Sequence, residues 1–552
     1  MEEIMKVVSR ISLISIIVAL SSFLCFQKNC GGKDPMIAGK KIAVVETKYG
    51  KVRGYIHNGI YVYKGIPYAK AERFMPPMEP DPWEDVRSSM HWGPVCPTMD
   101  PPKIGDDETE FLFQHDWGVP DEDCLRLNIW TPGINDGGNR PVMVWIHGGG
   151  FSYGSSQELP CYDGENLSRK GNIVLVSLNH RLNVIGFLDL SEFGERYKFS
   201  ANVGLLDIVE ALKWIKENIS NFGGDPDNVT LFGQSGGGGK IIALMSSPYA
   251  KGLFHKAIIQ SAWSPKFIKR RISSRISKAV VEELGLNLSQ IDSIQKIPYP
   301  ELADAAKQAL KNVVKQLQSE GYKLQRDGVT FGPTLDGDFL PYEQSDPRAF
   351  EISKDIPIII GTVKNEFPPS LWGKKPLRDA PLDSILASIK RWYGEKADEY
   401  IAAVKKAFPN DTRPTDLIDV DTYFRRTAVT YANLKSTYGS AKVYMYLFTW
   451  QSPIFDGDYK AIHCMELPFV FNNIGLWEEM TGGGKKAYAL ADKMSSAWIH
   501  FAKYGDPNHR GLPRWEPYTK ENGATMFFDN KCCMRYHHDK ELLEIIAEME
   551  NK

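Results

Sequence analysis

A serine flanked by glycines is the first feature of this chain that could do chemistry. Ser235 stands at the centre of residues 233–237, GQSGG, a G-x-S-x-G pattern. The β-branched, apolar run 228–231 precedes it, and the apolar run 240–245, which is typical of a helix, follows it. A sharp strand-to-helix turn of this kind exposes a nucleophilic hydroxyl, and glycine tolerates the backbone angles that the turn requires. The pattern predicts acyl transfer through Ser235, and a purely structural glycine turn is the alternative.

A second glycine run follows another apolar segment. Residues 141–147 lead directly into Gly148, Gly149 and Gly150. When a serine attacks an ester, the carbonyl oxygen becomes negative, and backbone N–H groups that approach closely can stabilise it. We therefore predict an oxyanion hole formed by the N–H groups of Gly149, Gly150 and Gly236. A flexible loop after a strand is the alternative for the run taken alone.

A serine nucleophile also needs a base, and the base needs an acid that orients it. In chains with a G-x-S-x-G turn the acid follows the serine, and the histidine follows the acid. The apolar run 356–361 predicts a buried strand, and Glu366 is the only carboxylate in the next segment, 362–367. We expect Glu366 to be the acid, and a solvated loop carboxylate is the alternative.

The histidine is expected in a loop beyond a later strand. His463 fits this position, because it follows the apolar run 443–448 and lies among apolar residues, where a polar ring needs a partner. His147 precedes the serine and adjoins the glycine run, so we expect it to brace that loop. Structural or solvated roles are expected for the other candidates, His500, His509, His537 and His538.

Strands and helices alternate along the chain in a way that is typical of a parallel sheet. Continuous apolar runs indicate strands buried on both faces, and segment 203–219 repeats apolar residues at helical spacing. This alternation predicts an α/β fold with a mostly parallel sheet covered on both faces and an active site at the carboxyl ends of its strands. Segments 41–45 and 50–55 predict a hairpin. The expected core strands lie at 128–131, 141–147, 173–178, 228–231, 257–260, 356–361 and 443–448.

The N-terminus differs from the rest of the chain. Lys6 and Arg10 precede an apolar run at 11–26, and a polar stretch follows. A basic flank, a short apolar core and a polar exit are typical of a signal peptide. Residues 1–30 therefore predict export to a secreted or periplasmic location, and an uncleaved membrane anchor is the alternative.

The charge of the chain and the spacing of its potential metal ligands give no reason to expect nucleic-acid or metal binding. The chain has 66 Lys and Arg against 68 Asp and Glu, and its net charge of −2 gives no reason to expect nucleic acid as a partner. Its eight cysteines show no C-x-x-C spacing, and no His, Asp or Glu cluster has the spacing of metal ligands. We expect neither a metal nor another cofactor.

The ordered motifs resemble the type-B carboxylesterase and cholinesterase family of α/β hydrolases over residues 40 to 530. The resemblance implies a single α/β-hydrolase domain at 40–552 that cleaves small-molecule esters. It carries the triad onto Ser235, Glu366 and His463 and implies a disulfide between Cys96 and Cys124. The matching segments are 122–130, 147–151, 179–182, 186–188, 202–207, 221–226, 233–237, 467–471 and 505–508.

Some positions depart from the family pattern. Gln234 stands before the serine, where cholinesterases carry a carboxylate. This weakens the field that would attract a cationic substrate and argues against a dedicated cholinesterase. Segments 265–330 and 365–440 are expected to supply the substrate walls. An amide or carbamate substrate and a non-catalytic adhesion relative are the alternatives. The further departures are Asn365, Phe367 and Cys464.

Overall fold

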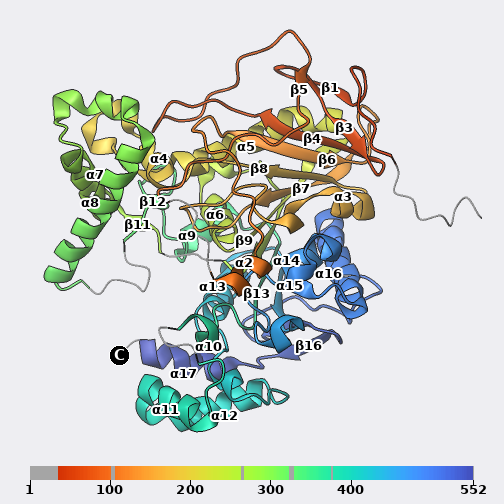
Figure 1. The fold of residues 1–552 in the computed structure, drawn as a ribbon, viewed down its shortest axis with the longest axis vertical. Coiled ribbons are helices and arrows are strands. Elements are labelled where there is room, and N and C mark those ends of the chain that lie inside the picture. Colours follow the sequence, from red (N-terminus) through yellow and green to blue (C-terminus); the bar gives the residue numbers. More distant parts are fainter. Residues whose placement is uncertain (1–34, 101–105, 263–265, 323–328, 374–376, 551–552) are drawn as a thin grey trace, which may run out of the picture.

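A computed structural model describes residues 35–100, 106–262, 266–322, 329–373 and 377–550. Its centre is a long twisted sheet, drawn as the arrows that cross Figure 1. In spatial order the strands are β16 (Cys533–Tyr536), β15 (Ala524–Phe528), β14 (Val443–Phe448), β13 (Ile358–Val363), β10 (Lys256–Gln260), β9 (Gly224–Gln234), β7 (Arg140–Ile146), β8 (Val174–Leu178), β6 (Arg126–Thr131), β4 (Ile60–Pro67) and β3 (Tyr55–His57).

The middle of the sheet is parallel, as the sequence predicts. All neighbours from β8 to β15 pair in parallel, whereas β3, β4 and β6 at one edge and β16 at the other pair antiparallel. Gln260 of β10 is in register with both Gln234 of β9 and Gly361 of β13. The carboxyl ends of these three strands are therefore level, and the segments that follow them meet at one edge of the sheet.

Helices cover both faces because side chains alternate along each strand. In β7, Val142, Val144 and Ile146 join one hydrophobic core, and Met143 and Trp145 join the other. The first core includes residues of α5 (Val203–Asn218), α6 (Gly236–Met245) and α13 (Phe424–Tyr438), and the second includes residues of α3 (Glu165–Gly171), α14 (Leu467–Val470) and α16 (Lys485–Tyr504).

Further helices extend the molecule beyond these layers. Figure 1 shows α7 (Arg270–Glu283) beside α8 (Tyr299–Ser319) at one side, and α11 (Leu382–Tyr393), α12 (Ala397–Ala407) and α17 (Lys540–Glu550) together at the lower end. The remaining α-helices and strands are α2 (Asp107–Leu112), α4 (Asn183–Phe187), α9 (Pro347–Ile352), α10 (Pro369–Trp372), α15 (Glu478–Thr481), β1 (Val44–Thr47), β2 (Gly50–Arg53), β5 (Arg87–Ser88), β11 (Ile268–Lys269) and β12 (Thr334–Leu335).

The predicted disulfide between Cys96 and Cys124 is not confirmed by the structure. Both residues are buried free thiols. The two thiols share a hydrogen bond, and Cys96 Sγ also accepts one from the backbone N–H of Leu182 at 3.2 Å. Both sulfur atoms thus take part in hydrogen bonds, and no covalent bond joins them.

The predicted signal peptide or anchor at 1–30 lies outside the described residues. Within the part of the chain that the structure describes, no helix has the length and apolar character needed to cross a bilayer. Export and the boundaries of a single domain at 40–552 stay predictions.

Candidate active site

Ser235 lies in a strained turn between β9 and α6. Its backbone angles are φ 56° and ψ −124°, which a residue other than glycine rarely adopts. The turn packs directly on the end of β7, since a Cβ added at Gly237 would lie 2.0 Å from the carbonyl oxygen of Ile146. Only glycine fits there, and the resulting strand-turn-helix geometry is that of a nucleophile elbow.

The structure brings the predicted acid and base together. Nδ1 of His463 lies 2.5 Å from Oε2 of Glu366, and the backbone N–H of His463 donates to the Glu366 carbonyl at 2.9 Å. Oε1 of Glu366 accepts from the Val363 N–H at 3.1 Å. These bonds leave the ring one orientation and favour the tautomer with its proton on Nδ1.

Burial sets the charge state of this pair. Glu366 is fully buried, and loss of solvation raises the pKa of its carboxyl above the usual value. The same effect lowers the pKa of His463 to about 4, although the nearby carboxylates of Glu466 and Asp421 oppose it. The resting imidazole is therefore neutral at physiological pH, which is the form that can take a proton.

The other ring nitrogen of His463 has an unexpected neighbour. Among the described residues, Nε2 of His463 contacts the amide Nε2 of Gln234 at 3.1 Å rather than the hydroxyl of Ser235. The Cys464 thiol donates to Oε1 of the same amide at 3.5 Å. The structure thus joins base to acid but not serine to base. Catalytic hydrogen bonds are often long or misaligned without substrate, so this state is compatible with later transfer of the serine proton.

The glycines predicted for the oxyanion hole meet beside the serine. A Cβ added at Gly236 would lie 2.2–2.5 Å from backbone atoms of Gly150, and one added at Gly148 would lie 3.4 Å from the Cβ of Ser235. Gly149 and Gly150 have φ of 77° and 61°. Neither of their N–H groups takes part in the backbone hydrogen bonds of the described residues, so both are available for a ligand.

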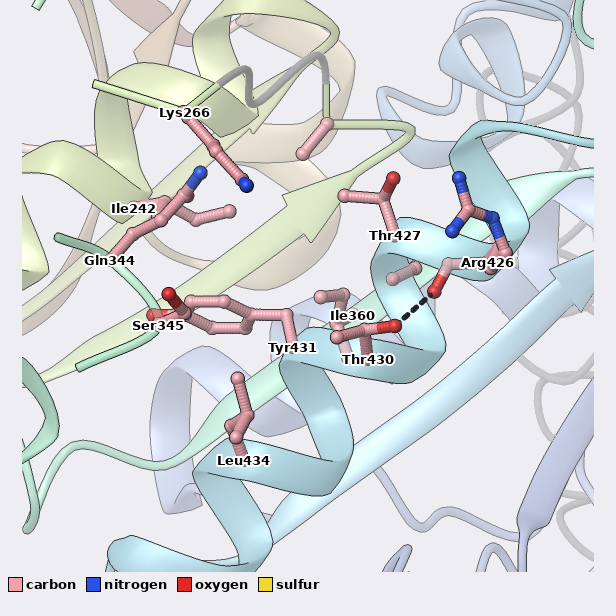
Figure 2. A pocket seen from close by; sticks show the side chains of 12 residues that line it. Ile242, Lys266, Gln344, Ser345, Ile360, Arg426, Thr427, Thr430, Tyr431 and Leu434 are labelled. Carbon is pink, nitrogen blue, oxygen red and sulfur yellow. Dashed lines mark hydrogen bonds between the residues drawn. The ribbon is translucent and has the colours of Figure 1, made fainter. Parts of the chain in front are cut away.

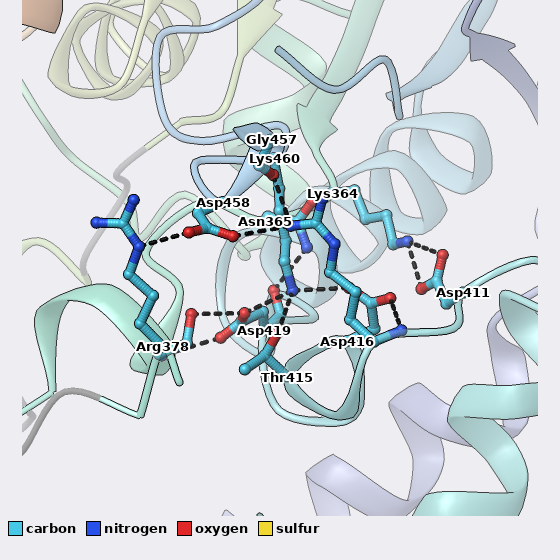
Figure 3. Close-up of polar contacts among 12 residues, drawn as sticks. Lys364, Asn365, Arg378, Asp411, Thr415, Asp416, Asp419, Gly457, Asp458 and Lys460 are labelled. Carbon is cyan, nitrogen blue, oxygen red and sulfur yellow. Dashed lines mark hydrogen bonds and ion pairs between the residues drawn. The ribbon is translucent and has the colours of Figure 1, made fainter. Parts of the chain in front are cut away.

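A buried polar network holds the loops that carry the acid and the base (Figure 3). Lys460 is 1% exposed, and its Nζ lies 2.7 Å from Oδ1 of Asp416 and 2.7 Å from Oδ2 of Asp419. Asn365 donates to the Asp419 carbonyl at 2.9 Å and exchanges hydrogen bonds with the backbone of Ala461. The residue just before Glu366 is therefore tied to the residue two positions before His463.

The sequence singled out Asn365 only as a departure from the family pattern, and its bridging role was missed. An amide beside a catalytic carboxylate can pair with backbone on both sides. That residue type was the available signal, but the partner segment could not be identified without the fold.

Two aromatic rings pack beside the base. The ring of Phe367 lies 4.6 Å from that of His463 between centroids, and the ring of Phe424 lies 5.3 Å away. Phe367 is 53% exposed and contacts the half-exposed Trp372. The approach to His463 thus offers apolar surface to a ligand.

A cavity of about 190 Å³ lies beside α6, the helix that follows Ser235 (Figure 2). It draws on both segments in which the sequence placed the substrate walls, through Lys266 and the first half of α13. Neither Ser235 nor His463 lines it. The lining residues are Ile242, Ala262, Lys266, Gln344, Ser345, Ile360, Arg426, Thr427, Ala428, Thr430, Tyr431 and Leu434.

The remaining histidines serve elsewhere. The ring of His147 is buried, stacks on His180 and places Nδ1 3.1 Å from the Gly148 carbonyl oxygen, so it braces the glycine loop as expected. His509 contacts the Lys493 carbonyl, and His538 adjoins Asp539. In the described ranges no group of three or more His, Cys, Asp or Glu is placed to hold a metal ion.

The known proteins that this chain resembles are named esterases or hydrolases. The sequence profile of the Carboxylesterase family matches residues 41–545. The chain is 38% identical to the para-nitrobenzyl esterase of Bacillus subtilis (strain 168) over 514 residues, which cover 90% of this chain and 97% of that protein. It is 33% identical to the phenmedipham hydrolase of Pseudarthrobacter oxydans over 500 residues, 88% of this chain and 94% of that protein.

A solved structure agrees. It is that of an esterase from anaerobic Clostridium hathewayi that can hydrolyze aliphatic aromatic polyesters, and it matches with a TM-score of 0.81 at 38% identity. The match covers 93% of this chain and 99% of that one. The predicted α/β-hydrolase fold and the family resemblance are confirmed.

Proposed function

This chain belongs to the carboxylesterase family, and from that premise we propose that it hydrolyses carboxylic esters through Ser235, His463 and Glu366 by way of an acyl-enzyme. The observation that carries the proposal is the short Glu366–His463 hydrogen bond at the same sheet edge as the strained Ser235. An acid-oriented, neutral imidazole at the same sheet edge as a partly exposed serine has the composition of a nucleophilic triad.

The reaction begins when the amide of Gln234 releases Nε2 of His463. Nε2 then takes the proton from the Ser235 hydroxyl while the serine oxygen bonds to the ester carbonyl carbon. The negative oxygen is held by the N–H groups of Gly149, Gly150 and Gly236. The C–O bond to the alcohol breaks, and the alcohol leaves with the proton from Nε2.

Water completes the cycle. His463 takes a proton from a water molecule, which attacks the acyl-serine and forms a second tetrahedral oxyanion in the same glycine loop. Collapse of this intermediate releases the carboxylic acid, and the proton on Nε2 returns to the serine oxygen. In each half, the Glu366 carboxylate accepts the hydrogen bond from Nδ1 of His463 and stabilises the imidazolium that forms, without taking its proton.

The surroundings of His463 support an ester with an apolar or aromatic portion. Phe367 and Phe424 face the ring of the base, and Gln234 supplies no charge that would bind a cationic alcohol. The names of two relatives, which refer to nitrobenzyl and aromatic polyester substrates, point the same way. The similarity to a phenmedipham hydrolase keeps a carbamate as the second candidate, since attack and oxyanion stabilisation are shared.

Hydrolysis of p-nitrophenyl butyrate tests the assignment. Ser235→Ala is expected to abolish turnover without loss of fold, and a fluorophosphonate is expected to label the peptide that contains Ser235. Ser246→Ala is the matched control, because that serine ends the same helix and only donates to the Ile242 carbonyl. Retained turnover in a folded Ser235→Ala variant would contradict the proposal.

We also propose that the enzyme is exported through residues 1–30 and works as one domain at 40–552. The apolar run at 11–26 behind Lys6 and Arg10 supports export. N-terminal sequencing of the protein in the extracytoplasmic fraction tests this. A start near residue 30 supports cleavage, an intact N-terminus in the membrane fraction indicates an anchor, and protein confined to the cytoplasm contradicts export.

A further inference from the structure

A fully buried lysine lies directly under the oxyanion loop. Lys240 is in the second turn of α6, five positions after Ser235, and its exposed fraction is 0%. Its Nζ donates to the carbonyl oxygen of His147 at 3.0 Å and to that of Gly148 at 3.3 Å. A charged side chain is rarely buried in this way, because removing it from water costs several kcal/mol unless it is paired.

The identity of the second acceptor gives the contact a consequence. The carbonyl of Gly148 and the N–H of Gly149 belong to one peptide group, whose atoms are coplanar. A bond that fixes the carbonyl therefore also fixes the direction of the N–H. A cation at the oxygen end draws electrons through the amide and strengthens the N–H as a donor. The same carbonyl lies 3.1 Å from Nδ1 of His147, so it is held from two sides.

Burial and the neighbouring groups act on the pKa of Lys240 in opposite directions. Burial lowers the pKa of Lys240 to about 7, and the nearby carboxylate of Glu158 opposes this shift. His147 and His180 face the same region, and burial together with the Lys240 charge keeps the pKa of both imidazoles well below the usual value. When it is protonated, Lys240 is the cationic group of a buried cluster that also holds the Glu158 carboxyl.

We propose that Lys240 is a positioning residue for ester hydrolysis, because it orients and polarises the Gly149 N–H toward the oxyanion. The inference rests on the proposed function of Ser235 and the glycine loop. It assigns to Lys240 a contribution that appears when negative charge develops on the substrate oxygen. Ground-state binding of the ester, which lacks that charge, depends on it far less.

Two substitutions separate the parts of this role. Lys240→Met removes both the donor and the charge at similar length, and Lys240→Gln keeps an N–H donor without the charge. Lys435→Met is the matched control. Lys435 is also fully buried and also donates to backbone carbonyls, those of Ser353 and Lys354, but these precede β13 and lie at the opposite edge of the sheet from Ser235.

The expected result is a loss of kcat with little change in KM for p-nitrophenyl butyrate. Lys240→Met is expected to lower kcat about tenfold, which is less than the loss of a whole oxyanion donor. The kcat of Lys240→Gln is expected to lie between that of Lys240→Met and that of the natural protein. Affinity for an alkyl trifluoromethyl ketone, whose adduct with a serine carries the same oxyanion, is expected to fall by the same factor as kcat. Lys435→Met is expected to leave both values unchanged.

Circular dichroism establishes that each variant is folded, and Lys240→Gln serves if Lys240→Met does not fold. A folded variant at Lys240 that keeps natural kcat and ketone affinity overturns the inference. A loss of kcat without loss of ketone affinity overturns it as well, because the effect would then not act on the oxyanion. Ser235→Ala in the same assay separates the two proposals. If that variant is active the proposed function fails, and if it is inactive while the Lys240 variants are fully active only this inference fails.

Discussion

Replacing Glu366 with Gln is the most informative change at the acid-base pair. Glutamine has nearly the same shape, and its Oε1 can keep the bond from the Val363 N–H at 3.1 Å. Its NH₂ group then faces Nδ1 of His463, where Oε2 of Glu366 now lies at 2.5 Å. Two donors cannot share that contact, so the imidazole moves its proton to Nε2. A ring with its proton on Nε2 cannot accept the proton of Ser235.

The change of tautomer determines how much kcat the Glu366→Gln variant is expected to lose. Loss of the orienting carboxylate in a triad of this type costs about 10⁴-fold in kcat, or about 5.4 kcal/mol of transition-state stabilisation. Loss of the nucleophile in Ser235→Ala costs about 10⁶-fold. Glu366→Gln is therefore expected to be much less damaging than Ser235→Ala, and KM is expected to change little because the ester does not contact the acid.

Initial rates with p-nitrophenyl butyrate measure both variants. Asp421→Asn is the matched control, since Asp421 is a half-buried carboxylate near His463 that instead accepts from the backbone N–H groups of Tyr423 and Arg425. That control is expected to retain kcat within about tenfold, because it changes the field at the ring but not its tautomer. A folded Glu366→Gln variant with kcat no lower than that of Asp421→Asn would refute the assigned role of Glu366.

Two further results are expected. The value of kcat/KM is expected to rise with pH through about 4, because burial lowers the pKa of His463 to that value and only the neutral ring is a base. A midpoint near the ordinary pKa of 6.5 in a pH-rate profile would contradict this expectation. Trp145→Ala is expected to cost about 3–5 kcal/mol in urea unfolding, because the buried ring packs on Tyr162, Phe232 and Phe471. Trp392→Ala, at a ring that is 41% exposed, is the control, and equal unfolding midpoints would count against the packing argument.

The fold could be predicted from the sequence where local pattern and environment agree. The strand expected at 443–448 is β14, Val443–Phe448, and the helix expected at 203–219 is α5, Val203–Asn218. Strands buried on both faces are apolar throughout, so their positions can be read directly. The short strand β15 and the helix pair α7 and α8 were not anticipated, because they depend on packing against distant segments.

The candidate site, like the fold, could be predicted from the sequence only in part. Gly149, Gly150 and Gly236 were predicted from two glycine motifs that follow apolar strands, and the structure places the loop of the first two against the third. The family resemblance implied a bond between Cys96 and Cys124, where the structure has two free thiols that contact one another. The resemblance indicated that these residues are near each other but could not determine their covalent state.

The sequence by itself determined which residues carry the chemistry and in what order. Turn glycines, apolar strands and the serine, acid and histidine sequence are local properties, because backbone angles and burial act on neighbouring residues. Only the tertiary structure decided the partners of those residues. Gln234 reaches His463 across 229 positions, and Lys240 reaches the Gly148 carbonyl across 92. Such contacts depend on how the sheet aligns the ends of its strands, and no local pattern specifies that alignment.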